Sequence, residues 1–217
     1  MFFVGREKEI KTVVDALTRG QNVVVTGKFG VGRTALIRHV AQTTPDHWRF
    51  IFLDFSRTAN QVCQNLLEEL LPGYKHEKLG YKVVRFKITH EDPPDRRRTI
   101  LVLDNLAKLS AGRFDLVRHL AFSKRFGLLP IVEPFVPEAD VRRIRAQLWP
   151  AAILTLPHLS ETESLSFFRG ARDHHRLAWE ESRIKNLAAA THGYPLLMRE
   201  AVEREHGKCK DKDGDSH

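Results

Sequence analysis

The sequence predicts an α/β fold in which a five-stranded parallel sheet is flanked by helices and followed by a small helical lid. Short apolar runs alternate with amphipathic stretches through the first 157 residues, and beyond Pro157 the apolar runs stop while the helical pattern continues. Strands that are separated by helices need crossover connections, which place them parallel in one sheet. The expected domains are an α/β domain over residues 1–157, a lid over 158–206 and a disordered tail over 207–217.

Five apolar runs have the length of strands that are buried on both faces, and several are rich in Val and Ile. They are Asn22–Thr26, Phe50–Phe55, Ile100–Leu103, Leu128–Val132 and Ala151–Leu156. Between them, apolar residues recur at helical spacing. These sets are Ile10, Val13, Val14 and Leu17; Leu36, Ile37 and Val40; Val62, Leu66, Leu67 and Leu70; and Val141, Ile144 and Leu148.

The lid is predicted to begin at a capping box, in which Ser160 caps the first helix and Glu163 reaches back to it. Three short helices follow from three apolar sets. They are Leu165 and Phe168; Ile184, Leu187 and Ala188; and Leu196, Leu197 and Ala201. The polar end of the chain, from Gly207 onward, has no apolar face and predicts a frayed tail.

The chain is basic: 35 Lys and Arg residues against 27 Asp and Glu give a net charge of +8, which favours an anionic partner. Residues 72–98 carry eight basic and four acidic side chains. This stretch is either a solvated insertion or a basic surface that contacts nucleic acid. Tyr81 to Ile88, within it, fits a short strand and a helical turn equally well.

Targeting signals and disulfides are not expected. No apolar run reaches the ~18 residues of a transmembrane helix, and the start of the sequence lacks the pattern of a secretory signal. The two cysteines, Cys63 and Cys209, form no disulfide framework and no metal-binding pattern. We therefore expect a cytoplasmic protein with reduced thiols that binds no membrane.

A glycine-rich loop follows the first predicted strand and opens an amphipathic helix, which is the setting of a phosphate-binding loop. Its residues, all candidates for nucleotide binding, are Gly27, Lys28, Phe29, Gly30, Val31, Gly32, Arg33, Thr34 and Ala35. The glycines let backbone N–H groups approach an anion, and the helix start adds free N–H groups and the positive end of its dipole. The Thr34 hydroxyl is expected to bind a Mg²⁺ ion that bridges the phosphates.

The loop departs from the usual pattern G-x-x-x-x-G-K-[ST] because Arg33 stands where lysine is found. The lysine ammonium is a compact charge, whereas guanidinium is planar, wider and forked. Arg33 retains the positive charge, so we expect phosphate binding to survive and hydrolysis to suffer. The alternative is a glycine-rich turn that binds no ligand.

Acidic and amide side chains end two of the predicted strands. Ligands of open α/β sheets bind at the carboxyl ends of the strands, so Asp104 is expected to hold Mg²⁺ together with Thr34; otherwise it is a turn carboxylate. Asn105 follows where many ATPases carry the glutamate that activates water, and an amide cannot accept that proton. Glu133, after the fourth predicted strand, is the remaining catalytic candidate; it either orients water or caps a turn.

These motifs resemble the AAA+ class of P-loop ATPases over residues 2–205. The likeness lies in Phe3-Val4-Gly5-Arg6-Glu7, in Gly32-Arg33-Thr34 and in the strand from Ile100 to Asp104. Two lid segments, Leu156 to Ser160 and His192 to Leu196, resemble the signal-transduction (STAND, NB-ARC-like) and origin-recognition-type branches. The resemblance implies that Val4, Gly5 and Pro195 contribute to the adenine pocket.

The resemblance implies a domain that binds ATP or ADP with Mg²⁺ and acts as an ATPase or a nucleotide switch. The departures at Arg33 and Asn105 imply slow or absent hydrolysis, and the expected partner is another protein or a second copy of the chain. One alternative is a DNA-binding accessory ATPase of the transposition or replication type, motivated by the basic 72–98 stretch and by Arg142, Arg143 and Arg145. The other is a P-loop scaffold that binds no nucleotide and pairs only with a protein.

Overall fold

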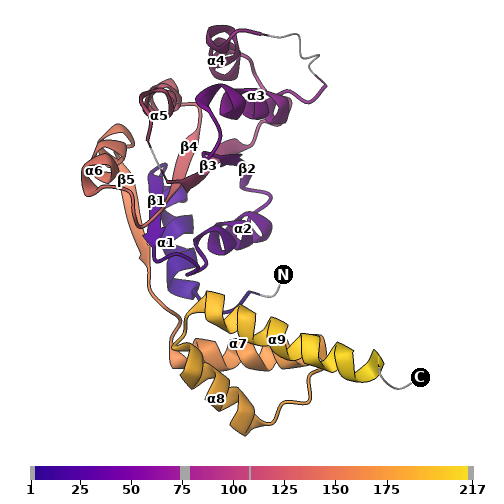
Figure 1. The fold of residues 1–217 in the computed structure, drawn as a ribbon. Coiled ribbons are helices and arrows are strands. Elements are labelled where there is room, and N and C mark those ends of the chain that lie inside the picture. The colour runs from indigo at the N-terminus through magenta and orange to yellow at the C-terminus, as the bar shows by residue number, and fades with distance from the viewer. Residues whose placement is uncertain (1–2, 74–78, 108, 215–217) are drawn as a thin grey trace.

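The computed structural model describes residues 3–73, 79–107 and 109–214, and it contains a five-stranded sheet in the order β2-β3-β4-β1-β5 (Figure 1). The strands are β1 (Asn22–Gly27), β2 (Trp48–Asp54), β3 (Arg98–Leu106), β4 (Gly127–Val132) and β5 (Ala151–Leu156). All neighbouring strands run parallel. The predicted five-stranded parallel sheet is therefore confirmed, and the five apolar runs supply its strands.

Helices cover both faces of the sheet (Figure 1). In the described part of the α/β domain they are α1 (Glu7–Thr18), α2 (Arg33–Thr43), α3 (Ala59–Leu70), α4 (Tyr81–His90), α5 (Ala111–Ser123) and α6 (Glu138–Gln147). Successive side chains of a strand face opposite sides, and β1 shows the division. Val23 and Val25 pack with α1 and α2, whereas Val24 belongs to the core that includes α3 to α6.

Within the basic stretch, Tyr81–His90 form helix α4 and not a strand. Val84 and Ile88 on one side of α4 are buried in the core shared with α3. Ion pairs neutralise several of its basic side chains: Arg85–Asp115 at 2.6 Å, Lys87–Glu91, and Arg97–Asp95 at 2.5 Å. Residues 74–78 lie outside the described residues. In its described residues the segment is thus packed against α3, and carboxylates balance the charge of these three side chains.

The lid consists of α7 (Glu161–His175), α8 (Glu181–Thr191) and α9 (Pro195–Gly214). It has an apolar core of its own, formed by Phe168, Ala171, Ile184, Ala188, Met198 and Val202. The capping box is present: the Ser160 hydroxyl accepts the N–H of Glu163 at 3.2 Å, and the Glu163 carboxylate accepts the N–H of Ser160 at 2.7 Å.

The predicted tail is wrong for residues 207–214, which continue helix α9. Extending an existing helix is much easier than nucleating one, so a polar segment without an apolar face can still propagate it. Residues 215–217 lie outside the described residues.

The environment of Cys63 makes it a structural thiol. It is fully buried on α3, and burial raises the pKa of its thiol to about 12, so it is inert as a nucleophile. The side chain of Cys209 lies outside the described part of the chain. Among the described helices, none combines the length and apolar character needed to cross a bilayer.

Candidate functional site

A cleft of about 730 Å³ lies between the phosphate loop and the lid. Figure 1 shows the lid helices α7, α8 and α9 below the α/β domain, on the side where the N-terminal end of the chain lies. The cleft is lined by Phe3, Val4 and Arg6 of that segment, by residues 29–35, by Asn105 and Glu133 at strand ends, and by lid residues that include Pro195, Leu196 and Arg199. The N-terminal segment, the phosphate loop, two strand ends and the lid therefore form one site.

The phosphate loop has the backbone geometry that an anion site requires. Gly30 and Gly32 have φ values of 73° and 93°, which favour glycine, and the N–H of Val31 closes the loop on the carbonyl of Lys28 at 3.2 Å. No side chain caps the start of α2. The first N–H groups of that helix therefore stay available to a bound phosphate.

Thr34 and Asp104 meet at the carboxyl edge of the sheet. The Thr34 hydroxyl donates to the Asp104 carboxylate at 3.1 Å, and the same carboxylate oxygen accepts the N–H of Asn105 at 2.9 Å. Hydroxyl and carboxylate oxygens are the donors that Mg²⁺ prefers when nucleotide phosphates complete its shell. Within the described residues, no group of three or more His, Cys, Asp or Glu side chains forms a separate metal site.

Arg33, the residue in the lysine position, is bound to the end of β4. Its side chain is 6% exposed; one guanidinium nitrogen donates to the Val132 carbonyl at 2.5 Å, and another to the Glu133 carboxylate at 2.6 Å. The Glu133 side chain is 12% exposed, so this ion pair is largely removed from water. The charge of Arg33 is thus balanced within the protein.

Asn105 bridges two carboxylates. Its side-chain amide donates to Asp54 at 3.1 Å, and its φ of 57° lies in the left-handed region that asparagine tolerates. Hydrogen bonds from Ser56 and Asn105 outweigh the opposing effect of burial and lower the pKa of Asp54. Asn105 therefore holds the ends of β2 and β3 together as a hydrogen-bond donor.

A turn of the lid contacts the phosphate loop. The Tyr194 hydroxyl donates to the Phe29 carbonyl, and the His158 ring stacks on the Tyr194 ring with centroids 5.0 Å apart. The Leu159 N–H donates to the Gly193 carbonyl at 2.8 Å. The lid turn is thereby joined both to the loop and to the segment that follows β5.

Arg6 is a site residue that the sequence analysis missed. Its side chain is 4% exposed and donates to the carbonyls of Pro157 at 2.7 Å and Val31 at 3.3 Å, while its backbone N–H donates to Glu163 at 2.9 Å. Burial opposes the shift, but hydrogen bonds from Arg6 and Ser160 lower the pKa of Glu163. Its position directly after Val4-Gly5 was the available signal.

Most of the predicted nucleotide-site residues line the cleft. These are Val4, Phe29, Gly30, Val31, Gly32, Arg33, Thr34, Ala35, Asn105, Glu133 and Pro195. The other four are not among the residues that line the cleft. Gly5 packs against Glu163, Gly27 ends β1, Lys28 is exposed, and Asp104 accepts a hydrogen bond from Thr34. Their binding and catalytic roles stay predictions.

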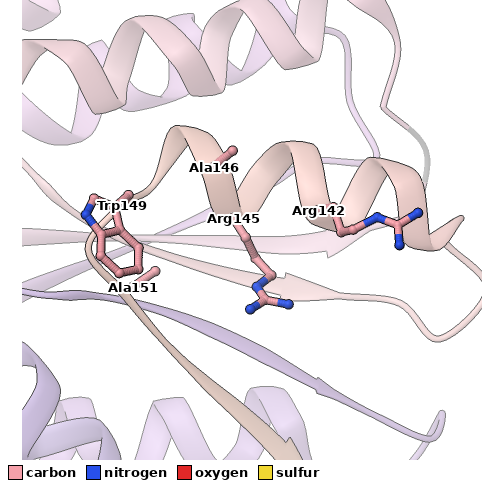
Figure 2. Close-up of a pocket in the computed structure, with 5 residues that line it drawn as sticks. All are labelled: Arg142, Arg145, Ala146, Trp149 and Ala151. Carbon is pink, nitrogen blue, oxygen red and sulfur yellow. The ribbon is translucent and has the colours of Figure 1, made fainter.

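The predicted basic face of α6 divides in two. Arg143 is turned toward α5, where it lies 4.3 Å above the Phe114 ring. Arg142 and Arg145 instead line a separate pocket of about 310 Å³ with Trp149, which is 82% exposed. Figure 2 shows these side chains along α6 and the turn that follows it.

Comparison with known proteins agrees with this architecture. A family model described as AAA ATPase domain matches residues 3–131. Cdc6p from Pyrobaculum aerophilum superposes with a TM-score of 0.67 at 12% identity, covering 97% of this chain and 65% of that one. Orc1 from Aeropyrum pernix in a complex with DNA gives 0.62 at 16% identity, covering 96% and 66%. The RuvB Holliday junction branch migration motor from Thermotoga maritima gives 0.62 at 16% identity, covering 93% and 62%.

The chain spans just under two thirds of each of these structures, and identities this low establish a shared fold alone. No curated protein matches it. The family match, however, covers more than half of the chain and includes the phosphate loop, Thr34 and Asp104. The chain therefore belongs to the AAA ATPase domain family.

Proposed function

We propose that this domain is a nucleotide switch: it binds ATP or ADP with Mg²⁺ in the cleft, and the bound nucleotide biases the position of the lid. The observation that carries the proposal is the contact between the Tyr194 hydroxyl of the lid and the Phe29 carbonyl of the phosphate loop. A nucleotide that moves the Phe29 carbonyl when it binds would weaken this contact, and the lid position would then change with nucleotide occupancy.

The cleft offers each part of a nucleotide a suitable surface. Phe3, Val4 and Leu196 provide apolar contacts for a base, and the N–H groups at the start of α2 face the phosphates. Thr34 and Asp104 would hold Mg²⁺, which would neutralise phosphate charge when bound. A protein partner or a second copy of the chain would receive the lid signal.

Slow or absent hydrolysis is part of this proposal. Phosphoryl transfer depends on positioning the attacking water and on stabilising charge at the terminal phosphate. Asn105 is an amide engaged with Asp54, and Glu133 is engaged with Arg33, so neither side chain is poised as a free base. Nucleotide occupancy, and not turnover, would carry the signal.

Changing Gly32 to Asp tests nucleotide binding. A carboxylate in the phosphate loop repels phosphate, and an added Cβ meets no atom within 4 Å. The φ of 93° strains any L side chain, so the control must carry the same strain. We expect a fluorescent ATP analogue with Mg²⁺ to bind Gly32→Asp at least tenfold more weakly, a loss of about 1.4 kcal/mol or more.

Gly73→Asp is the matched control. Gly73 has a φ of 89° and is equally unobstructed, but it lies outside the cleft, so this variant introduces the same residue under the same backbone conditions. It should bind the analogue like the wild type. Equal binding by the wild type and Gly32→Asp would exclude nucleotide binding at this loop.

The second candidate function is DNA binding through α6. Trp149 offers an exposed ring for stacking on a base, and Arg142 and Arg145 offer charges for phosphates beside it (Figure 2). The Orc1 structure, solved with DNA, shares the fold of this chain. Arg142 pairs with Glu138 at 3.1 Å, so Trp149 and Arg145 carry this candidate. The α4 side chains Arg85 and Lys87 are ion-paired, and no comparable exposed indole lies beside them in the described structure.

Filter binding to single-stranded and duplex DNA checks this candidate. We expect Trp149→Ala and Arg145→Glu each to weaken retention about tenfold at low salt, because each removes a stacking or phosphate contact. Lys11→Glu, which makes the same change of charge at an exposed site on α1, should have a much smaller effect. No retention of the wild type even at low salt would eliminate DNA binding.

A further inference from the structure

We infer that the nucleotide site selects a nucleoside diphosphate over a triphosphate, and that Glu133 is the residue that sets this selectivity. The inference rests on the proposed function, because it concerns the same cleft. It depends on the ion pair between Arg33 and Glu133 and on the acidic side chains at the strand ends. Nucleotide binding alone requires neither feature.

The pair between Arg33 and Glu133 removes the cation that a terminal phosphate needs. In a phosphate loop, backbone N–H groups cradle the α- and β-phosphates, and the side chain at the position of Arg33 reaches the β- and γ-phosphates, so only the γ-phosphate depends on that side chain alone. Here two of its nitrogens are already bound, one to the Val132 carbonyl at 2.5 Å and one to Glu133 at 2.6 Å. With 6% and 12% of the two side chains exposed, water screens the pair weakly, and breaking it would leave a carboxylate uncompensated.

The sheet edge that carries Glu133 holds other carboxylates. Asp54 ends β2, Asp104 lies near the carboxyl end of β3, and Glu133 follows β4; the three strands are consecutive in the sheet order β2-β3-β4. Asp54 and Asp104 are direct register partners. Mg²⁺ held by Thr34 and Asp104 would offset the charge of Asp104. Glu133 would keep its charge and would keep Arg33 neutralised, so it opposes the added charge of a third phosphate.

The arginines that line the cleft are also engaged. In the described structure, Arg6 binds the carbonyls of Pro157 and Val31, Arg38 lies 4.6 Å above the Phe52 ring, and Arg199 pairs with Glu203 at 3.4 Å. The groups that bind inner phosphates are different ones: the N–H groups of the loop and of the start of α2. The uncapped start of α2 leaves those groups available. A diphosphate thus finds its partners in place, whereas a triphosphate must first disrupt the Arg33–Glu133 pair.

Calorimetry with Mg²⁺ and either ADP or ATP tests the inference on the full chain. We expect the wild type to bind ADP at least tenfold more tightly than ATP. In Glu133→Gln, the amide oxygen can still accept from Arg33 but the negative charge is gone. The ATP affinity of this variant should rise about tenfold, while its ADP affinity stays within about threefold of the wild type. Glu138→Gln, which removes an 81% exposed carboxylate at the start of α6, is the matched control and should leave both affinities unchanged.

The outcomes separate the inference from the proposed function. If neither nucleotide binds, the proposed function fails and the inference fails with it. If the wild type binds ATP as tightly as ADP or more tightly, the nucleotide switch stands and diphosphate selectivity is wrong. The last case is a wild type that selects ADP and a Glu133→Gln variant that has a cooperative thermal unfolding transition, and so is folded, but retains the same selectivity. In that case Glu133 does not set the selectivity.

Discussion

Replacing Gly193 by alanine is expected to lower the free energy of unfolding by about 3 kcal/mol or more and to free the lid from the phosphate loop. The φ of Gly193 is 66°, where an L side chain is strained, and an added Cβ would overlap the carbonyl oxygen of Leu159. The backbone would have to move apart. That movement would break the 2.8 Å hydrogen bond between the Leu159 N–H and the Gly193 carbonyl and would displace the neighbouring Tyr194 from Phe29.

Gly20→Ala isolates the steric part of this effect. Gly20 has a φ of 75°, but the nearest atom to an added Cβ is the Arg98 guanidinium at 3.6 Å, which is ordinary contact. This control should lose only the conformational cost of about 1 kcal/mol. Urea unfolding measures both values, and limited proteolysis between β5 and α7 reports release of the lid. Equal losses in the two variants would contradict a tight packing of the lid turn on Leu159.

The fold was predictable where burial shapes short stretches of sequence. The strands are buried on both faces, so they read as continuous apolar runs, and their order along the chain implies crossovers. Helix α5 was not predicted, because its buried positions Leu116, Val117 and Leu120 are few and basic residues separate them. The type of α4 was ambiguous for a similar reason: its buried face, Val84 and Ile88, is too short to define a period until it packs on α3.

The site was predictable only where its chemistry is local in sequence. The phosphate loop and the strand that carries Asp104 each have a recognisable pattern. The fold brings the Thr34 hydroxyl within 3.1 Å of the Asp104 carboxylate. The partner of Arg33 could not be read in this way. Glu133 lies 100 residues away, and it reaches Arg33 because β4 is the neighbour of β1 in the sheet. The contact from Tyr194 to Phe29 likewise depends on where the lid packs.

Removal of the Arg33 side chain is expected to be among the most destabilising single changes in the α/β domain. Arg33→Met keeps an unbranched chain but leaves the Glu133 carboxylate, 12% exposed, without its partner at 2.6 Å. An uncompensated charge at such a site costs about 3 kcal/mol. The Val132 carbonyl also loses its donor. Glu133→Gln should cost less, because its amide oxygen still accepts a hydrogen bond from the guanidinium.

Urea unfolding of Arg33→Met, of Glu133→Leu and of the variant that combines them completes a double-mutant cycle. When both charges are gone, no buried carboxylate is left unpaired, so the double variant should recover to within about 1 kcal/mol of the wild type. Lys11→Met, which breaks an exposed pair with Asp15 at 3.1 Å, is the control and should change stability by less than about 0.5 kcal/mol. If Arg33→Met is no less stable than Lys11→Met, the pair with Glu133 does not form in solution. Arg33 is then free to meet a terminal phosphate, and the physical basis for diphosphate selectivity is lost as well.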